Sequence, residues 1–309
     1  MVKQSKLHTF GRLAATAALS FAALTSQAAI VEYTDFSDVS DLVLNGDAAT
    51  AVTGDGSVLR LTPATFSQSG SAFSQTTVNA ANFSTYFSFR ISSPGGSLFD
   101  CNSINGADGL VFVAQSVSSS ARVAGGGIGY AGIGNSLGVE WDTSCNAANN
   151  DPSSNHIGVN INGNVNRGAG SPHTANIGDD TVREDGFDNG EIWHAWVDYD
   201  GTTVEVRTNQ TGIRSLLPDL TRVLDLPTIL GQDDAYIGFT SGTGADYGQP
   251  RHSGVGVSRR VRSRAKCAGT CDGAGLRTGA SRTVAREVTR GLTQARDRPP
   301  LGGQSIRPT

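Results

Sequence analysis

The residues with the clearest chemical potential lie between Gly138 and Gly158, in the stretch GVEWDTSCNAANNDPSSNHIG. Glu140 and Asp142 alternate within an apolar run, and His156 opens the next apolar run. On a strand, side chains two positions apart point to the same face at a separation of about 6.6 Å. Two carboxylates side by side on a partly buried face repel each other unless a cation lies near them. The pattern therefore predicts a metal site.

The ligand types indicate which ions would bind. Carboxylate, amide and carbonyl oxygens suit calcium, whereas a site with an imidazole suits a transition metal such as manganese. Asp142 and Asp151 have two carboxylate oxygens each and could bridge two ions. The alternative is a polar loop beside a satisfied surface histidine, without any ion. The density of candidate ligands beside one apolar run favours the metal.

Strands must position these residues, and the apolar pattern predicts them. In Phe83–Ile91, the side chains of Phe87 and Phe89 share a face with both ends of the run, which is the period of a half-buried strand. No long run shows helical periodicity with caps. Asp200-Gly201 indicates a hairpin with a type I′ turn, which needs positive φ. The sum predicts an antiparallel sandwich. Its other expected strands are residues 30–33, 58–61, 109–114, 137–141, 157–161, 193–199, 203–207 and 235–239.

The N-terminus has the pattern of a secretory signal peptide. Lys3, Lys6 and Arg12 precede the apolar run Leu13–Leu24, and small residues follow at the expected cleavage positions. We expect residues 1–28 to be removed. The run is too short to span a bilayer, which takes roughly 20 apolar residues. The protein is therefore expected to be secreted or periplasmic, without a membrane span.

The C-terminus reverses the charge of the chain. Residues 250–309 carry twelve Arg and one Lys against three acidic residues, whereas residues 1–249 carry eleven basic and twenty-five acidic residues. The tail has no aromatic residue, so it cannot bury enough apolar surface to offset its ordering entropy. A nucleic-acid arm is the alternative, but no aromatic interleaving or known motif accompanies the charge. We expect one folded domain over residues 29–249, a disordered tail and no nucleic-acid partner.

Four cysteines follow the export signal. Cys101 and Cys145 lie in the acidic domain, whereas Cys267 and Cys271 lie in the tail. An oxidising compartment permits disulfides, and the sequence does not set their connectivity. A bridge between Cys101 and Cys145 is favoured because both flank the candidate site loops. Two free or differently paired thiols are the alternative.

Several segments together resemble the legume-type (L-type) lectin family. Residues 140–158 are similar to its metal-binding signature, with the same intervals between ligands. Phe83–Ile91 resembles the family's FSTxFSF strand, residues 107–112 its ADGLAFF strand, and Trp193–Gly201 its WxxWIDYDG hairpin. The resemblance runs from about Ile30 to Tyr247. It implies a concanavalin-like antiparallel β-sandwich (jelly roll) in a bacterial-like, secreted member that binds glycans and is not an enzyme.

The resemblance also implies the ligands of two ions. In the family, a calcium ion and a neighbouring transition-metal ion, usually manganese, order the sugar-binding loops and do no chemistry. Asp142 and Asp151 would ligate both ions. Calcium would also take the Ser144 carbonyl and Asn146, and the transition metal would also take Glu140 and His156.

A sugar site beside the calcium is implied in the same way. Asp108, which follows a cis Ala107-Asp108 peptide in the family, would accept hydrogen bonds from two sugar hydroxyls. The side-chain amide of Asn146 would donate another. A backbone N–H from Gly126 or Gly127 would complete the set.

The chain departs from the family pattern at the surface that packs against the sugar. Plant members place an aromatic ring where Ser144 stands, and Tyr130 or Tyr247 could replace it. The loop that sets sugar preference in the family carries Thr243 and Gly244, which we expect to contact the sugar. The sequence therefore leaves sugar specificity open, and it leaves the oligomeric state open as well.

A second departure concerns the C-terminal end of the domain. The family continues after Tyr247-Gly248-Gln249 into a closing strand of the type ILSWSF, whereas this chain enters its Arg-rich tail. The sandwich could therefore lack its closing C-terminal strand. A disrupted reading frame is the corresponding hypothesis.

Two other function classes compete with the lectin. Glycoside hydrolases of the same fold carry E-x-D-x-x-E, and retaining hydrolysis needs two carboxyls roughly 5–5.5 Å apart. In this chain the third carboxylate of that pattern is replaced by Cys145, which cannot serve as the acid. The other class is an adhesive or structural module whose metals only stabilise the fold. That module would not need Asp108, whereas the lectin would, so the need for Asp108 distinguishes the two non-enzymatic hypotheses.

Overall fold

The computed structural model describes residues 30–96, 106–121, 127–166, 173–178 and 182–258. The expected signal peptide, Cys101, Gly126 and the tail from residue 259 lie outside these residues. Within the described part, no helix is both long and apolar enough to cross a bilayer.

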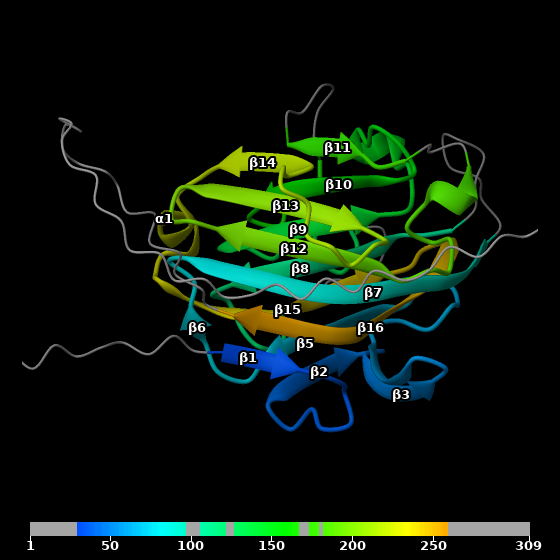
Figure 1. The fold of residues 1–309 in the computed structure, drawn as a ribbon, viewed down its shortest axis with the longest axis horizontal. Coiled ribbons are helices and arrows are strands. Elements are labelled where there is room, and N and C mark those ends of the chain that lie inside the picture. The colour runs from blue at the N-terminus through cyan, green and yellow to red at the C-terminus, as the bar shows by residue number, and fades with distance from the viewer. Residues whose placement is uncertain (1–29, 97–105, 122–126, 167–172, 179–181, 259–309) are drawn as a thin grey trace, which may run out of the picture. The chain divides into compact units, whose positions relative to one another are not determined.

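Two antiparallel sheets face each other as layers (Figure 1). The first contains β1 (Ile30–Tyr33), β3 (Ala49–Thr53), β4 (Gly56–Arg60), β7 (Phe83–Gly96), β12 (Trp193–Tyr199), β13 (Thr203–Asn209), β14 (Leu220–Val223) and β16 (Asp246–Ser258). Its order is β14-β13-β12-β7-β16-β4-β3, and β1 pairs with β16.

The second sheet carries the candidate site. It contains β2 (Leu42–Gly46), β5 (Ser69–Ser74), β6 (Val78–Asn79), β8 (Gly109–Gln115), β9 (Ser136–Asp142), β10 (His156–Ile161), β11 (Thr174–Asn176) and β15 (Asp234–Gly242). Its order is β11-β10-β9-β8-β15-β5-β2, and β6 pairs with β15. Short helices, η1 (Ala147–Asn149), η2 (Arg183–Asp185) and α1 (Leu226–Leu230), lie in the connections. The antiparallel sandwich predicted from the sequence is confirmed.

The core fills the space between the sheets with aromatic side chains. Phe87 from β7 is fully buried, and its ring lies edge-on to Trp141 at 5.1 Å and to Phe239 at 4.9 Å. Trp141 and Phe239 belong to the opposite sheet. Such edge-to-face pairs stabilise a core beyond their buried area. The period of two read from the sequence of β7 therefore points its apolar side chains into the core.

The predicted hairpin between β12 and β13 is present, but its turn type differs from the prediction. Tyr199 pairs with Val204, and the backbone N–H of Asp200 donates to the Thr203 carbonyl at 3.3 Å. Of the two residues between Asp200 and Thr203, Gly201 has positive φ (97°), and Thr202 does not. A type I′ turn needs positive φ at both positions, whereas type II′ needs it only at the first. The turn is therefore of the II′ kind.

The expectation that the closing C-terminal strand could be missing is wrong. β16 pairs antiparallel with β7 from Asp246 opposite Gly96 to Ser258 opposite Ser84, with two register shifts. It also pairs with β1 and β4, so it lies inside the sheet. The strand continues past residue 249, which was predicted from the sequence as the end of the domain. The alternation rule overlooked it because Gly residues interrupt the apolar run.

Candidate functional site

The register of three neighbouring strands assembles the predicted metal ligands. His156 on β10 pairs directly with Asp142 on β9, so both side chains lie on one face of the sheet. Glu140 is two positions from Asp142 and shares that face. The positions opposite Glu140 and Asp142 on the flanking strands include Gly158 and Gly109, which have no side chain to fill the space. The strand pairing therefore brings three ligand side chains together.

These three side chains form a compact and buried cluster. Ligand atoms of Glu140, Asp142 and His156 all lie within 4.8 Å of one another. The His156 Nε2 atom is 3.6 Å from Glu140 Oε1 and 3.9 Å from Asp142 Oδ2. Glu140 and His156 are 0% exposed and Asp142 is 2% exposed. At these distances the two carboxylates disfavour each other's charge unless a cation compensates.

The orientation of the His156 ring fits a metal ligand. Its Nδ1 atom lies 2.9 Å from the Ser153 carbonyl, which can only accept a hydrogen bond. Nδ1 therefore carries a proton, and Nε2 faces Glu140 and Asp142. Nε2 is buried without a hydrogen-bond partner among the described residues. A cation bound by Nε2 and the two carboxylates would satisfy all three groups.

A polar loop after β9 continues the site. The backbone N–H of Ser144 donates to Asp142 Oδ1 at 2.8 Å, and that of Asn146 donates to Asp151 Oδ2 at 2.8 Å. These bonds fold the loop back over the end of β9. Within the loop, the short helix η1 ends at Asn150, whose backbone is in the left-handed region, at φ 57°. The two hydrogen bonds link the predicted calcium ligands in two pairs, Ser144 with Asp142 and Asn146 with Asp151. This donor set, rich in oxygen, fits calcium. Among the described residues, Asp151 is not part of the compact cluster of Glu140, Asp142 and His156.

Asp108 lies beside this loop, at the start of β8. The Ala107-Asp108 peptide is cis, as the resemblance implies. Asp108 is 4% exposed and is hydrogen-bonded by the Asn146 side chain. The pKa of the Asp108 carboxyl is raised to about 7, chiefly by burial; the hydrogen bond from Asn146 lowers it, and the charges of Asp246 and Asp151 raise it. Its Oδ2 atom has no hydrogen-bond partner among the described residues, so it is available as an acceptor.

Of the two loop residues expected to contact the sugar, one adjoins Asp108 and the other is occupied by hydrogen bonds within the protein. A Cβ placed on Gly244 would be 3.9 Å from Asp108 Oδ2, so this loop residue does adjoin the acceptor. Thr243 is fully buried, and its hydroxyl both accepts from Gln68 N and donates to the Thr65 carbonyl. The Thr243 side chain is therefore occupied within the protein, contrary to its expected sugar contact. Its hydroxyl anchors the loop instead.

The loop that begins at Gly127 also approaches this end of the second sheet. Thr240 Oγ1 donates to the Ile128 carbonyl at 2.9 Å, next to Gly127 in the chain. The N–H of Asp108 donates to the Gly242 carbonyl, two residues further along β15. The structure therefore places Gly127 near the same strand end as Asp108, while a direct contact between them is not among the described interactions. Gly126 lies outside the described residues.

Of the two tyrosines considered as an aromatic platform, Tyr130 is excluded. It is 0% exposed and its hydroxyl accepts hydrogen bonds from Ser136 and from the Gly163 backbone. Tyr247 is half-buried, and Ser144 is 8% exposed. Cys145 is disulfide-bonded, so it is not a free thiol, and its predicted partner Cys101 lies outside the described residues.

Two buried groups escaped the sequence reading. Asn160 donates to Glu140 Oε2 at 2.7 Å and orients that carboxylate. It lies two positions after Gly158 and four after His156, so the strand alternation of β10 could have predicted that its side chain shares the face of His156. Asp246 is 6% exposed and acts on Asp108 across the loops. No local pattern indicates this contact, because it joins residues far apart in the chain.

The comparisons with known proteins agree with this arrangement. A two-sheet sandwich with a buried acidic cluster at loop-covered strand ends defines a β-sandwich recognition domain. The chain belongs to the legume lectin family, since the model of the legume lectin domain matches residues 30–252.

Two curated relatives of this chain come from plants. The L-type lectin-domain containing receptor kinase VIII.1 of Arabidopsis thaliana is 31% identical over 206 residues, which cover 65% of this chain and 26% of the kinase. Favin of Vicia faba is 30% identical over 184 residues, which cover 55% of this chain and 67% of favin. The chain thus spans about a quarter of the length of the kinase, and the matching part is the lectin domain. The bacterial-like, secreted character stays a prediction.

Solved structures support the fold. The lectin from Bauhinia forficata, in complex with GalNAc, superposes with a TM-score of 0.60 at 22% identity, covering 76% of this chain and 99% of that one. Lectin I-B4 from Griffonia simplicifolia, in a metal-free form, superposes with a TM-score of 0.61 at 22% identity, covering 75% and 100%. The concanavalin-like sandwich is therefore confirmed. The domain is a lectin domain, a class of domain that binds carbohydrate.

Proposed function

We propose that this chain is a secreted lectin whose sugar-binding loops are ordered by calcium and by a transition-metal ion such as manganese. The buried cluster of Glu140, Asp142 and His156 carries the proposal, because His156 Nε2 faces two carboxylates and has no hydrogen-bond partner among the residues that the structure describes. The signal peptide expected over residues 1–28 supports secretion.

The roles divide between residues that hold ions and residues that face the sugar. Glu140 and His156 would hold the transition metal, the Ser144 carbonyl and Asn146 the calcium, and Asp142 and Asp151 both ions. Bound cations supply charge compensation, which keeps the buried carboxylates ionised.

Recognition itself falls to groups that can exchange hydrogen bonds with hydroxyls. Asp108 accepts through Oδ2, Asn146 donates from its amide, and a backbone N–H of Gly126 or Gly127 donates to a sugar oxygen. Related lectins are described with GalNAc and with galactose, so these sugars are the first probes. A charge-assisted hydrogen bond contributes about 1.5–3 kcal/mol.

Metal removal tests the proposal. We expect exhaustive treatment with EDTA to abolish binding on a glycan array, and calcium with manganese to restore it. Acid should act in the same direction, because the ligands must be deprotonated to bind metal. Glycan binding that is unchanged after complete metal removal would contradict the two-ion role.

The Asp108→Asn variant separates a lectin from a metal-stabilised adhesive module. The substitution keeps the size of the side chain but removes the charge that accepts hydroxyl protons. A lectin should lose glycan binding by at least tenfold while keeping its metal content, measured by atomic emission. The exposed Asp233→Asn change is the control. Equal glycan binding by Asp108→Asn and the unmodified chain would favour the adhesive module.

A further inference from the structure

An exposed aromatic ring stands beside the candidate sugar site and has no role so far. Phe66 is 49% exposed, in the segment between β4 and β5. An exposed phenylalanine is ordinary by itself, so its surroundings decide what it can do.

The backbone ties Phe66 to the loop that adjoins Asp108. The N–H of Ser67 donates to the Gly244 carbonyl at 3.1 Å, directly after Phe66 in the chain. Gly244 in turn adjoins Asp108 Oδ2, at 3.9 Å from the place of a Cβ. Thr243 reinforces the connection, because its N–H donates to the Gln68 carbonyl at 3.0 Å. Phe66 and Asp108 therefore both lie close to the loop that contains Thr243 and Gly244.

A second ring braces Phe66. Tyr247 meets it edge-to-face, with ring centroids 5.0 Å apart and an interplanar angle of 88°. The Tyr247 ring packs over Gly95, whose absent Cβ would fall 2.9 Å from the ring. A glycine at this position of β7 therefore lets Tyr247 lie flat against the backbone. The arrangement holds one aromatic ring in place while the other keeps about half of its surface in solvent.

We propose that Phe66, braced by Tyr247, is the apolar platform of an additional sugar subsite, and that the domain therefore binds oligosaccharides more tightly than single sugars. The inference rests on the proposed lectin function. Pyranose rings present a face of C–H groups, and an aromatic ring offers a large rigid apolar surface at low entropic cost. Ser144 cannot supply such a surface. A first sugar at Asp108 would place its neighbour across Gly244, toward Phe66.

Calorimetric titration tests this subsite. A glycan array first identifies an oligosaccharide that the unmodified chain binds. Kd is then measured for that oligosaccharide and for its terminal monosaccharide, with the Phe66→Ala and Phe66→Trp variants and with Ile213→Ala as control. Ile213 is 75% exposed on the loop after β13 of the other sheet, so its loss tests a general effect of removing surface apolar area.

We expect Phe66→Ala to weaken oligosaccharide binding about tenfold and to leave monosaccharide binding unchanged. Phe66→Trp should retain the preference, and Ile213→Ala should behave like the unmodified chain. Unchanged affinities, or an equal loss for both ligands, would overturn the subsite. An unmodified chain that binds no glycan would instead overturn the lectin function itself, and the subsite with it. Circular dichroism checks that each variant is folded.

Discussion

Asn160 shows how single side chains prepare the site. It lies on the same face of β10 as His156 and donates to Glu140 Oε2, while the Ser153 carbonyl fixes the His156 ring. Such partners orient a ligand and set its protonation, although they never touch the ion. They also use hydrogen-bonding capacity that would otherwise remain buried and unpaired.

Asn160→Ala should therefore lower the affinity for manganese by about 10–100-fold. The variant leaves every proposed ligand in place, so the effect measures orientation alone. Competition with a metal-chelating dye gives the affinity, and Asn209→Ala on the other sheet provides the control. Manganese affinity equal to that of the unmodified chain would show that Glu140 needs no such partner.

Among individual residues, the sequence predicted those side chains whose position depends on the two-residue repeat of a strand. Glu140, Asp142 and His156 lie together because a strand repeats every two residues, which the sequence displays. Thr243 and Tyr130 were misjudged because their burial depends on contacts with segments far away in the chain. The same holds for Asp246, which reaches Asp108 only after the loops have folded.

Among the elements, β8 runs very close to β9 at Gly109. Its φ is 113°, and a Cβ there would lie 2.1 Å from the Trp141 carbonyl oxygen. A side chain would therefore push β8 from β9 where Gly109, the residue after Asp108, pairs with Asp142. Only glycine adopts this conformation readily and leaves this room.

Gly109→Ala should accordingly lower the free energy of unfolding by about 2–4 kcal/mol, as strain and overpacking combine. Urea denaturation gives this value. Gly54→Ala is the matched control, because nothing lies within 4 Å of its Cβ position. Equal stability of the two variants would mean that β8 shifts without cost.

The composition of β16 fits a disrupted reading frame. From Pro250 the chain reads Pro-Arg-His-Ser-Gly-Val-Gly-Val-Ser. When the first nucleotide of the Pro250 codon is skipped, codons compatible with this run can be read as His-Asp-Ile-Leu-Gly-Trp-Glu-Phe. This alternative keeps the ILxWxF spacing of the family's closing strand. The strand position is thus retained, whereas His252, Ser253, Val255 and Val257 occupy the places at which the alternative frame has Ile, Leu, Trp and Phe.

A chain that follows the alternative frame after Gln249 should unfold at a higher temperature, because Ile, Leu, Trp and Phe offer more apolar surface to bury than His, Ser and Val at the same positions. Differential scanning calorimetry compares it with the present chain and with a version in which the same residues are scrambled. A melting temperature no higher than that of the present chain would argue against the disrupted frame. Sequencing the gene checks the nucleotide directly.

The sequence predicted strands wherever apolar alternation was continuous, and each of those strands is present. The strands β2, β3, β5, β6, β11, β14 and β16 were not predicted, because they are short or consist largely of small and polar residues. β5 illustrates the point, since Ser69–Ser74 is wholly buried yet contains only one large apolar side chain. Its burial results from neighbours on both sides, β15 and β2, rather than from its own composition.

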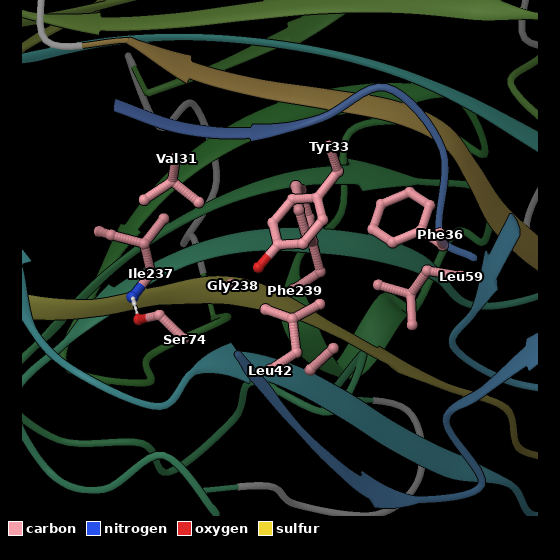
Figure 2. A pocket seen from close by; sticks show the side chains of 10 residues that line it. Val31, Tyr33, Phe36, Leu42, Leu59, Ser74, Ile237, Gly238 and Phe239 are labelled. Carbon is pink, nitrogen blue, oxygen red and sulfur yellow. Dashed lines mark hydrogen bonds between the residues drawn. The ribbon is translucent and has the colours of Figure 1, made fainter. Parts of the chain in front are cut away.

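For the molecule as a whole, the packing between the two sheets is incomplete at one place. A cavity of about 30 Å³ lies between β1 and β4 of one sheet and β2, β5 and β15 of the other (Figure 2). Val31, Leu42 and Ile237 are among its lining side chains, and the Ser74 hydroxyl there already accepts a hydrogen bond from Ile237 N. The apolar side chains around this space lack packing partners on one side and so lose van der Waals contacts.

Val31→Ile adds one methylene at the cavity and should raise the free energy of unfolding by about 0.8 kcal/mol. Chemical denaturation measures this change. The same substitution at Val117, which is 56% exposed, should have almost no effect. Destabilisation by Val31→Ile would show that the cavity cannot accept the added group in a relaxed rotamer.

β9 contributes side chains both to the hydrophobic core and to the candidate metal site. Val139 and Trp141 point into the core, whereas Glu140 and Asp142 point to the ligand side. One residue gained or lost early in this strand would exchange the two sets, so that carboxylates enter the core and an indole leaves it. The surrounding loops can therefore change in length, and with them the ligand that is recognised. The strand itself cannot change in length without disturbing both the core and the ligand side.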